Sequence, residues 1–483
     1  MQKKFITNLA LLLMLNLLIK PIWMLGIDRE VQNVIVDAAD YGIYFALFNF
    51  SFLFNIFLDF GITNFNNKNI AQNNQLLTKH LSSILILKFM LAAIYMIVAL
   101  SIGFAIGYNS NQLWMLFLLA FNQFLVSFIL YLRSNLAGLH LFKTDSLVSV
   151  MDRSIMIVIC IVLLWGNVTG GVFKIEWFVY AQFAGYFITA IITFFLVTAK
   201  AEFLKLRWNY SFFKMILKQS FPYAILVLLM TFYNRIDTVM LERMLPDEIG
   251  AVQSGIYAQA YRLLDSANMI AFLFAGLLLP IFARMIKLKQ RVEDMVKLSA
   301  SLLLAPALIV AIGSYFYSND LMNLMYVKNI ENSAVVFGIL MSCFVAVSTT
   351  YIFGTLLTAN GNLKQLNFMA LIGMIINLSL NLILIPKYHA IGAAISSLIT
   401  QFVTAFFQVF IAVKVFKMKT DYSFVIKFLV FTVGVFLIAV SSKFISNSWL
   451  INFVLMTIMA FSWAFVTRLI SIKSIYTIIK SDE

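Results

Sequence analysis

Residues 231–286 read TFYNRIDTVMLERMLPDEIGAVQSGIYAQAYRLLDSANMIAFLFAGLLLPIFARMI. The segment divides into two apolar helices joined by the short acidic loop LERMLPDEIGAVQ. Arg235 and Asp237 lie inside the first predicted helix, and Arg262 and Asp265 lie inside the second. An ionisable side chain costs about 3 kcal/mol or more at the centre of a bilayer, so one that persists there usually faces a polar cavity or a partner. The stretch therefore predicts a polar site inside a membrane protein.

The composition supports the membrane assignment. Of 483 residues, 62% are hydrophobic and only 12% are charged, and the mean hydropathy is +0.93. A soluble domain of this length would need a larger charged surface. The formal net charge of +14 does not indicate a nucleic-acid partner, because the basic residues gather in loops between apolar segments.

Segments of the length needed to cross a bilayer, about 20 apolar residues, recur along the whole chain. We predict about fourteen spans, with the N-terminal segment as a retained first span rather than a signal peptide, since it has no small-residue cleavage site. The predicted spans are 5–27, 41–62, 82–107, 112–132, 147–166, 176–198, 219–241, 255–283, 298–317, 334–358, 366–386, 390–413, 422–442 and 448–470.

The loop charges predict the orientation of these spans. Alternate loops are rich in Lys and Arg, above all 199–218 and 284–297, whereas the opposite loops carry acidic residues such as Asp40 and Asp247. Cytoplasmic loops are enriched in Lys and Arg, so both termini are predicted to be cytoplasmic. The two long basic loops are amphipathic, which fits either a surface helix that joins the bundle halves or attraction to anionic lipid.

A short motif occurs twice. Tyr41-Gly42-Ile43-Tyr44 opens the second predicted span, and Ser254-Gly255-Ile256-Tyr257 opens the eighth. Both motifs enter the membrane from the predicted outer side, six spans apart. An even number of spans returns the chain to the same side of the membrane. The pattern therefore predicts two repeats in parallel orientation.

Motifs of enzymatic chemistry are missing from the sequence. It contains no G-x-x-x-x-G-K-[ST] phosphate loop, no HExxH and no CxxC. No nucleophile or acid–base constellation stands out, the loops are short, and Cys160 and Cys343 lie in apolar runs as expected for buried thiols. We therefore predict a transporter that has no catalytic residues, resident metal or cofactor and does not itself hydrolyse ATP.

The basic residues inside the spans are the evidence for a ligand. Arg235, Arg262 and Lys20 are predicted to lie in the outer half of their spans, and we call these three residues the basic collar. Arg offers bidentate geometry for phosphate, so one reading is capture of an anionic group. The other reading is a set of structural ion pairs with Asp237 and Asp265.

Other polar residues within the spans support weaker predictions. Asp59 is either a cation or proton site or a capped helix end. Asn234, Asn377 and Asn381 are candidates for the polar lining of a cavity, although asparagines in apolar helices often form hydrogen bonds between helices instead.

The remaining charged and amide side chains are expected to have structural roles. Asn122 and Gln123 are predicted to form hydrogen bonds between helices. Lys88, Arg153 and Lys427 are placed close enough to the cytoplasmic side for their charges to snorkel out of the membrane.

Three stretches carry a family resemblance. NRIDTVMLERMLPDEIGAVQSGIYAQAYRLLD (234–265) resembles the central signature of prokaryotic polysaccharide-lipid flippases. Residues 356–400, LLTANGNLKQLNFMALIGMIINLSLNLILIPKYHAIGAAISSLIT, and residues 40–62, DYGIYFALFNFSFLFNIFLDFGI, are similar to further parts of that family. The family belongs to the multidrug/oligosaccharidyl-lipid/polysaccharide (MOP) exporter superfamily.

The resemblance implies an all-α fold with two pseudo-symmetric six-helix lobes around a central cavity, plus two C-terminal helices. The lobes would be residues 1–200 and 201–415, and residues 416–483 would hold the extra helices and the tail. By this resemblance, Arg235 and Arg262 would contact the substrate's anionic group, with Lys20 as a third contact. Na⁺ or H⁺ would drive transport through Asp59 or Asp237.

The implied function is transfer of an undecaprenyl-pyrophosphate-linked oligosaccharide to the outer leaflet of a bacterial inner membrane, for lipopolysaccharide O-antigen or capsule synthesis. Its partners would be this lipid-linked substrate, membrane lipids and polysaccharide assembly proteins. Three alternatives stay open: a lipid II flippase, a drug/cation antiporter of the same superfamily, and a membrane glycosyltransferase or polymerase.

Overall fold

The computed structural model describes residues 14–16, 18–34, 38–63, 66, 70, 75–139, 141–166, 173–201, 208, 210–419 and 421–469. Throughout these ranges the regular structure is helical, with no strand. The chain forms two compact units, residues 1–255 and 256–483. This division rests on contacts within each unit, and the lobe boundaries that the family resemblance implies stay predictions.

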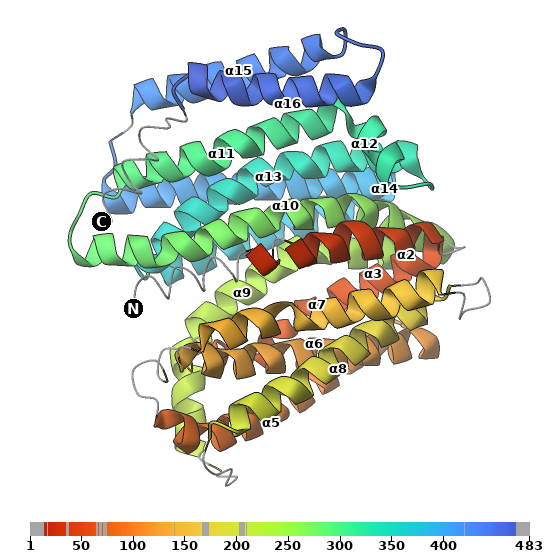
Figure 1. The fold of residues 1–483 in the computed structure, drawn as a ribbon, viewed down its shortest axis with the longest axis vertical. Helices are drawn as coiled ribbons and strands as arrows, with labels where there is room; N and C mark the ends of the chain where they lie inside the picture. Colours follow the sequence, from red (N-terminus) through yellow and green to blue (C-terminus); the bar gives the residue numbers. More distant parts are fainter. Residues whose placement is uncertain are drawn as a thin grey trace. The chain divides into compact units, whose positions relative to one another are not determined.

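The first unit is a bundle in which α3 and α6 occupy the middle. The helix α3 packs against α6 and α9, and α6 packs against α5, α7 and α8 (Figure 1). The elements are η1 (Ile22–Asp28, a π-helix), α2 (Arg29–Val34), α3 (Ala38–Leu53), η2 (Asn55–Leu58, a 3₁₀-helix), α5 (Leu76–Ala105), α6 (Ser110–Gly138), α7 (Phe142–Trp165), α8 (Ile175–Thr198) and α9 (Tyr210–Met244). The next helix, α10 (Asp247–Lys287), begins in this unit and continues into the second.

In the second unit, α13 packs between α11 and α14. The elements are α11 (Glu293–Phe316), α12 (Ser318–Met325), α13 (Ile330–Ala359), α14 (Leu363–Phe416), α15 (Tyr422–Ser442) and α16 (Trp449–Val466). The last two helices, drawn in blue in Figure 1, pair with each other and pack against α11. Buried Phe431, Val435 and Met456 fill their contact with α11.

Eleven helices in the described residues are long and apolar enough to cross a membrane. One of them, α14, covers two predicted spans, which meet at His389 with φ 52° and ψ −130°. The second predicted span is α3 followed by the short η2, and residues 5–13 and 17 of the first predicted span lie outside the described residues. The chain is therefore a multi-pass, all-helical membrane protein, as predicted.

The two copies of the repeated motif meet in the structure. A Cβ on Gly42 would lie 1.8 Å from the carbonyl oxygen of Ala251 and 2.9 Å from the amide nitrogen of Gly255. The hydroxyl of Ser254 donates to the carbonyl of Gly42 at 3.1 Å. Such a close backbone approach requires glycine at position 42, and small residues are the usual means of packing membrane helices tightly. The beginnings of α3 and α10 are thus in direct backbone contact.

Candidate functional site

Arg235 lies within the membrane-spanning part of α9 and is held by α3. Its Nη1 donates to Asn49 Oδ1 at 3.2 Å, and its guanidinium lies 5.3 Å from the centre of the Phe52 ring. Asn49 in turn donates to Thr238 Oγ1 at 2.9 Å. Two helices therefore fix a permanent cation inside the span.

The other polar residues of this helix differ in burial. Asp237 is 1% exposed, whereas Asn234 and Arg235 are half-buried. Side chains two positions apart point to different sides of a helix, so Asp237 is enclosed by packing while Arg235 borders more open space.

Arg262 and Asp265 lie on the part of α10 that belongs to the second unit. Arg262 is buried and Asp265 is half-buried. On α14 of the same unit, Asn377 and Asn381 are fully buried, and Asn381 donates to Asn377 Oδ1 at 3.2 Å. The basic collar divides between the units, with Lys20 and Arg235 in the first and Arg262 in the second. A common depth for the three cations, and a cavity role for the asparagines, stay predictions.

Lys20, just before η1, has a basic neighbour, Arg153, whose charge was predicted to snorkel out of the membrane. Arg153 lies in the middle of α7, with its guanidinium 5.4 Å from the Trp23 ring and 5.3 Å from the Tyr186 ring. Lys20 is within electrostatic reach of Arg153, Asp152 and Arg133. Aromatic rings from η1 and α8 flank the Arg153 guanidinium, and snorkelling of Arg153 stays a prediction.

Lys88 is also inside the protein. Its side chain is 1% exposed and forms an ion pair with Asp59, whose side chain is 30% exposed. Lys88 Nζ also donates to the carbonyl of Leu58 at 2.9 Å and to Ser127 Oγ at 3.0 Å. Three oxygen acceptors surround the ammonium, so the prediction that Lys88 snorkels is wrong. The signal in the sequence was the pair of opposite charges in consecutive predicted spans.

Asp59 lies where the second span loses its helical form. It follows η2 and accepts a hydrogen bond from Thr63 Oγ1 at 2.5 Å, and the backbone then turns left-handed at Phe60 (φ 44°) and Gly61 (φ 79°). Asp59 binds a cation, the Lys88 ammonium, and it also lies at a helix end. The cation-site reading and the helix-end reading of Asp59 therefore both stay open. Its role as the coupling site is untested.

Asn122 departs from its predicted role. It is 2% exposed on α6, and neither amide atom has a hydrogen-bond partner within the described part of the chain. Gln123 Oε1 is also buried without a hydrogen-bond partner in the described part of the chain. Buried amides usually find partners, so this interior position is suited to a bound water.

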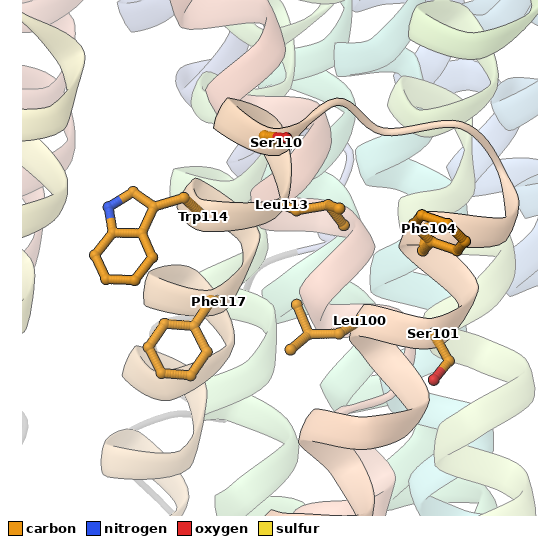
Figure 2. A pocket seen from close by; sticks show the side chains of 7 residues that line it. All are labelled: Leu100, Ser101, Phe104, Ser110, Leu113, Trp114 and Phe117. Carbon is orange, nitrogen blue, oxygen red and sulfur yellow. The ribbon is translucent and has the colours of Figure 1, made fainter.

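Two cavities of the first unit differ in chemistry from the basic residues above. Figure 2 shows a cavity of about 570 Å³ between the last turns of α5 and the first turns of α6. Phe104, Leu113 and Phe117 help to line it, and no charged side chain does. A second cavity, of about 420 Å³, is bordered by Asp40 and Glu176. Neither has the basic lining that an anionic ligand requires.

Comparison with solved structures identifies the fold. The chain is similar to the lipid II flippase MurJ in an inward closed conformation, with a TM-score of 0.62 and 14% identity over 89% of this chain and 97% of that one. It is also similar to an inward-facing multidrug resistance MATE family transporter of the MOP superfamily, with a TM-score of 0.58 and 16% identity over 86% and 99%.

A third similar structure is a MOP superfamily transporter from Pyrococcus furiosus, with a TM-score of 0.55 and 13% identity over 85% of this chain and 94% of that one. At these identities the likeness shows the fold alone. No curated protein matches the chain.

The family follows from the sequence. The family model described as "Polysaccharide biosynthesis protein" matches residues 5–286, which is more than half of the 483 residues. The match contains Lys20, Arg153, Arg235 and Arg262. The chain therefore belongs to the polysaccharide biosynthesis protein family, and it has the fold of MOP superfamily transporters.

Proposed function

We propose that the protein moves a polyprenyl-pyrophosphate-linked oligosaccharide from the cytoplasmic to the outer leaflet of a bacterial inner membrane by alternating access. The family description supports a role in polysaccharide biosynthesis. Such substrates combine a long lipid, a pyrophosphate and a hydrophilic glycan. A helical bundle with a polar interior allows the tail to stay in hydrocarbon while the charged and hydroxylated parts cross.

The observation that carries the proposal is the placement of Arg235. Its guanidinium is held inside a span by Asn49 and Phe52, and Arg is suited to bidentate binding of phosphate oxygens. Arg262 is proposed as a second contact. Lys20 is a third, and Arg153 beside it enlarges the basic group in the first unit.

Energy would come from a Na⁺ or H⁺ gradient. Asp59, Asp237 and Asp265 are the proposed coupling residues. For Asp59, external cation binding would require displacement of the Lys88 ammonium, because that group already neutralises the carboxylate. The proposed settings are O-antigen or capsule synthesis, with polysaccharide assembly proteins as partners.

The test is translocation of a fluorescent polyprenyl-pyrophosphate oligosaccharide in proteoliposomes with equal amounts of protein. Arg235→Ala and Arg262→Ala are each expected to lower the rate about tenfold or more, the effect of losing a hydrogen bond to a charged group. The matched control is Arg243→Ala at the end of α9. Arg243 Nη2 forms an ion pair with Glu242 Oε1 at 2.5 Å, and its guanidinium lies 4.2 Å from the centre of the Tyr108 ring.

Three outcomes would contradict the proposal. Unchanged transport in both variants would make Arg235 and Arg262 structural. Faster transport of lipid II than of the oligosaccharide lipid would replace the substrate class. No transport by the wild type under either gradient, together with export of organic cations, would indicate an antiporter.

A further inference from the structure

An apolar groove of about 530 Å³ lies in the first unit between α5 and the beginning of α9. The groove is distinct from the basic collar and from Arg153. Its apolar walls include Leu87, Leu91 and Ile94 from α5 and Phe213, Leu217 and Phe221 from α9. The α5 wall belongs to the candidate span His80–Ala105, and Phe221 is the first residue of the span Phe221–Met244. The groove therefore begins where the α9 span begins and runs along the α5 span to about its middle, with walls suited to a hydrocarbon chain.

Two lysines bring positive charge to this groove. Lys214 and Lys218 both line it, and their spacing of four residues places them on one side of α9. Both side chains are exposed. The surrounding segment 199–218 contains five basic residues and one acidic residue. An apolar groove with a cationic rim is complementary to a molecule that has both an acyl chain and an anionic head group.

Aromatic residues mark the level of the groove in the membrane. Trp208 is 61% exposed and Tyr210 is 67% exposed, and both line the groove. Trp208 contacts the Phe213 ring edge to face, with ring centres 5.4 Å apart. Trp and Tyr are enriched at the boundary between the head groups and the hydrocarbon. The lysines are thus placed at head-group level, on the side that the loop charges predict to be cytoplasmic.

We propose that this groove binds an anionic phospholipid of the cytoplasmic leaflet. The head-group phosphate would contact Lys214 and Lys218, and one acyl chain would lie along the α5 wall. Basic pockets between membrane helices on the cytoplasmic side are suited to anionic lipids. Inorganic phosphate alone would leave the apolar walls uncovered. This lipid would bind the groove whichever substrate the protein transports.

The bound lipid would lie beside a proline of α9. Pro222 follows the groove directly inside α9, and a proline in a helix removes a backbone hydrogen bond and permits a kink. A lipid that bridges α5 and residues 210–221 would hold the helix segment before Pro222 in place. The lipid would thereby connect the composition of the membrane to the position of α9.

The test uses quenching of Trp208 fluorescence by brominated lipids in the purified full-length protein. Phosphatidylglycerol and phosphatidylcholine with identical brominated chains are compared, and the Trp208→Phe variant gives the background from the other tryptophans. Each lysine near an anionic surface contributes about fivefold to binding. Phosphatidylglycerol is therefore expected to bind roughly 25-fold more tightly than phosphatidylcholine, and Lys214→Gln/Lys218→Gln is expected to remove that preference.

The matched control is Lys287→Gln/Lys414→Gln, which removes two exposed charges from the ends of other helices and should keep the preference. Equal quenching of the wild type by both lipids would overturn the proposal, as would a preference that survives in Lys214→Gln/Lys218→Gln. A brominated polyprenyl phosphate that outcompetes phosphatidylglycerol would also overturn it, because the occupant would then be a substrate-like lipid. Native mass spectrometry provides an independent count of retained lipid for each variant.

Discussion

At the scale of single residues, the buried pair Asp59–Lys88 gives a prediction about stability. Asp59→Asn would leave the Lys88 ammonium enclosed without its counter-charge, a change that costs about 3–5 kcal/mol for a buried pair. Lys88→Met should cost less, because Asp59 is 30% exposed and keeps access to water. The double variant should recover most of the loss, since it leaves no isolated charge. Thermal unfolding in detergent measures all three, and additive effects of the two single changes would contradict the pairing.

The sequence placed Arg235 inside a membrane span, as the structure does, but it did not predict the partners of Arg235. The depth of Arg235 followed from the lengths of the apolar segments. Its partner Asn49 lies 186 positions away in the chain, and no pattern within a helix specifies such a contact. Arg153 and Lys88 were assigned to the surface because long basic side chains can snorkel. Three oxygen acceptors enclose the Lys88 ammonium inside the protein, whereas two aromatic rings flank the partly exposed Arg153.

At the scale of helices, the contact between α3 and α10 gives a prediction about packing. Gly42→Ala should destabilise the protein by about 3 kcal/mol or more, because the new methyl group would overlap the Ala251 carbonyl and overpacking forces the backbone to move. The control is Gly276→Ala on α10, where a Cβ meets nothing within 4 Å and alanine favours the helix. Thermal unfolding compares the two variants. Equal stability of Gly42→Ala and Gly276→Ala would show that α3 and α10 can move apart at no cost in stability.

Regular helices were predicted well, and their interruptions were predicted less well. The boundary between spans at residues 387–389 was expected from the sequence, and the structure has its bend at His389. The end of α3 was not expected, because residues 54–62 are as apolar as the helix before them. The π-helical turn at η1 likewise has no local sequence signal, since packing against α7 supports an unusual hydrogen-bond pattern that propensity does not encode.

At the scale of the whole molecule, the loop charges give a prediction about orientation. A cysteine at Asn447, between α15 and α16, should react with a membrane-impermeant maleimide added outside intact cells. A cysteine at Gln290, between α10 and α11, should react only after the membrane is opened. The native thiols Cys160 and Cys343 are buried and should contribute little background. The reverse labelling pattern would show that the basic loops face outward.

The number of membrane spans could be predicted from the composition of the chain. Fourteen segments were expected, and eleven helices of spanning length include α14, which holds two of them. Hydrocarbon thickness sets these lengths, so they can be read locally. The positions of charged partners depend on contacts between helices and had to come from the three-dimensional structure.

The Asp59–Lys88 pair has a consequence for biogenesis. The two residues are 29 positions apart in the chain, in segments that leave the ribosome one after the other. A lone lysine within a segment opposes its entry into the membrane, by up to about 2.5–3.5 kcal/mol at the segment centre. The earlier segment supplies the neutralising carboxylate before α5 has to leave the translocon. The second and third membrane segments are thus suited to insert together as a hairpin, and the charge that would delay one segment is cancelled by the segment made just before it.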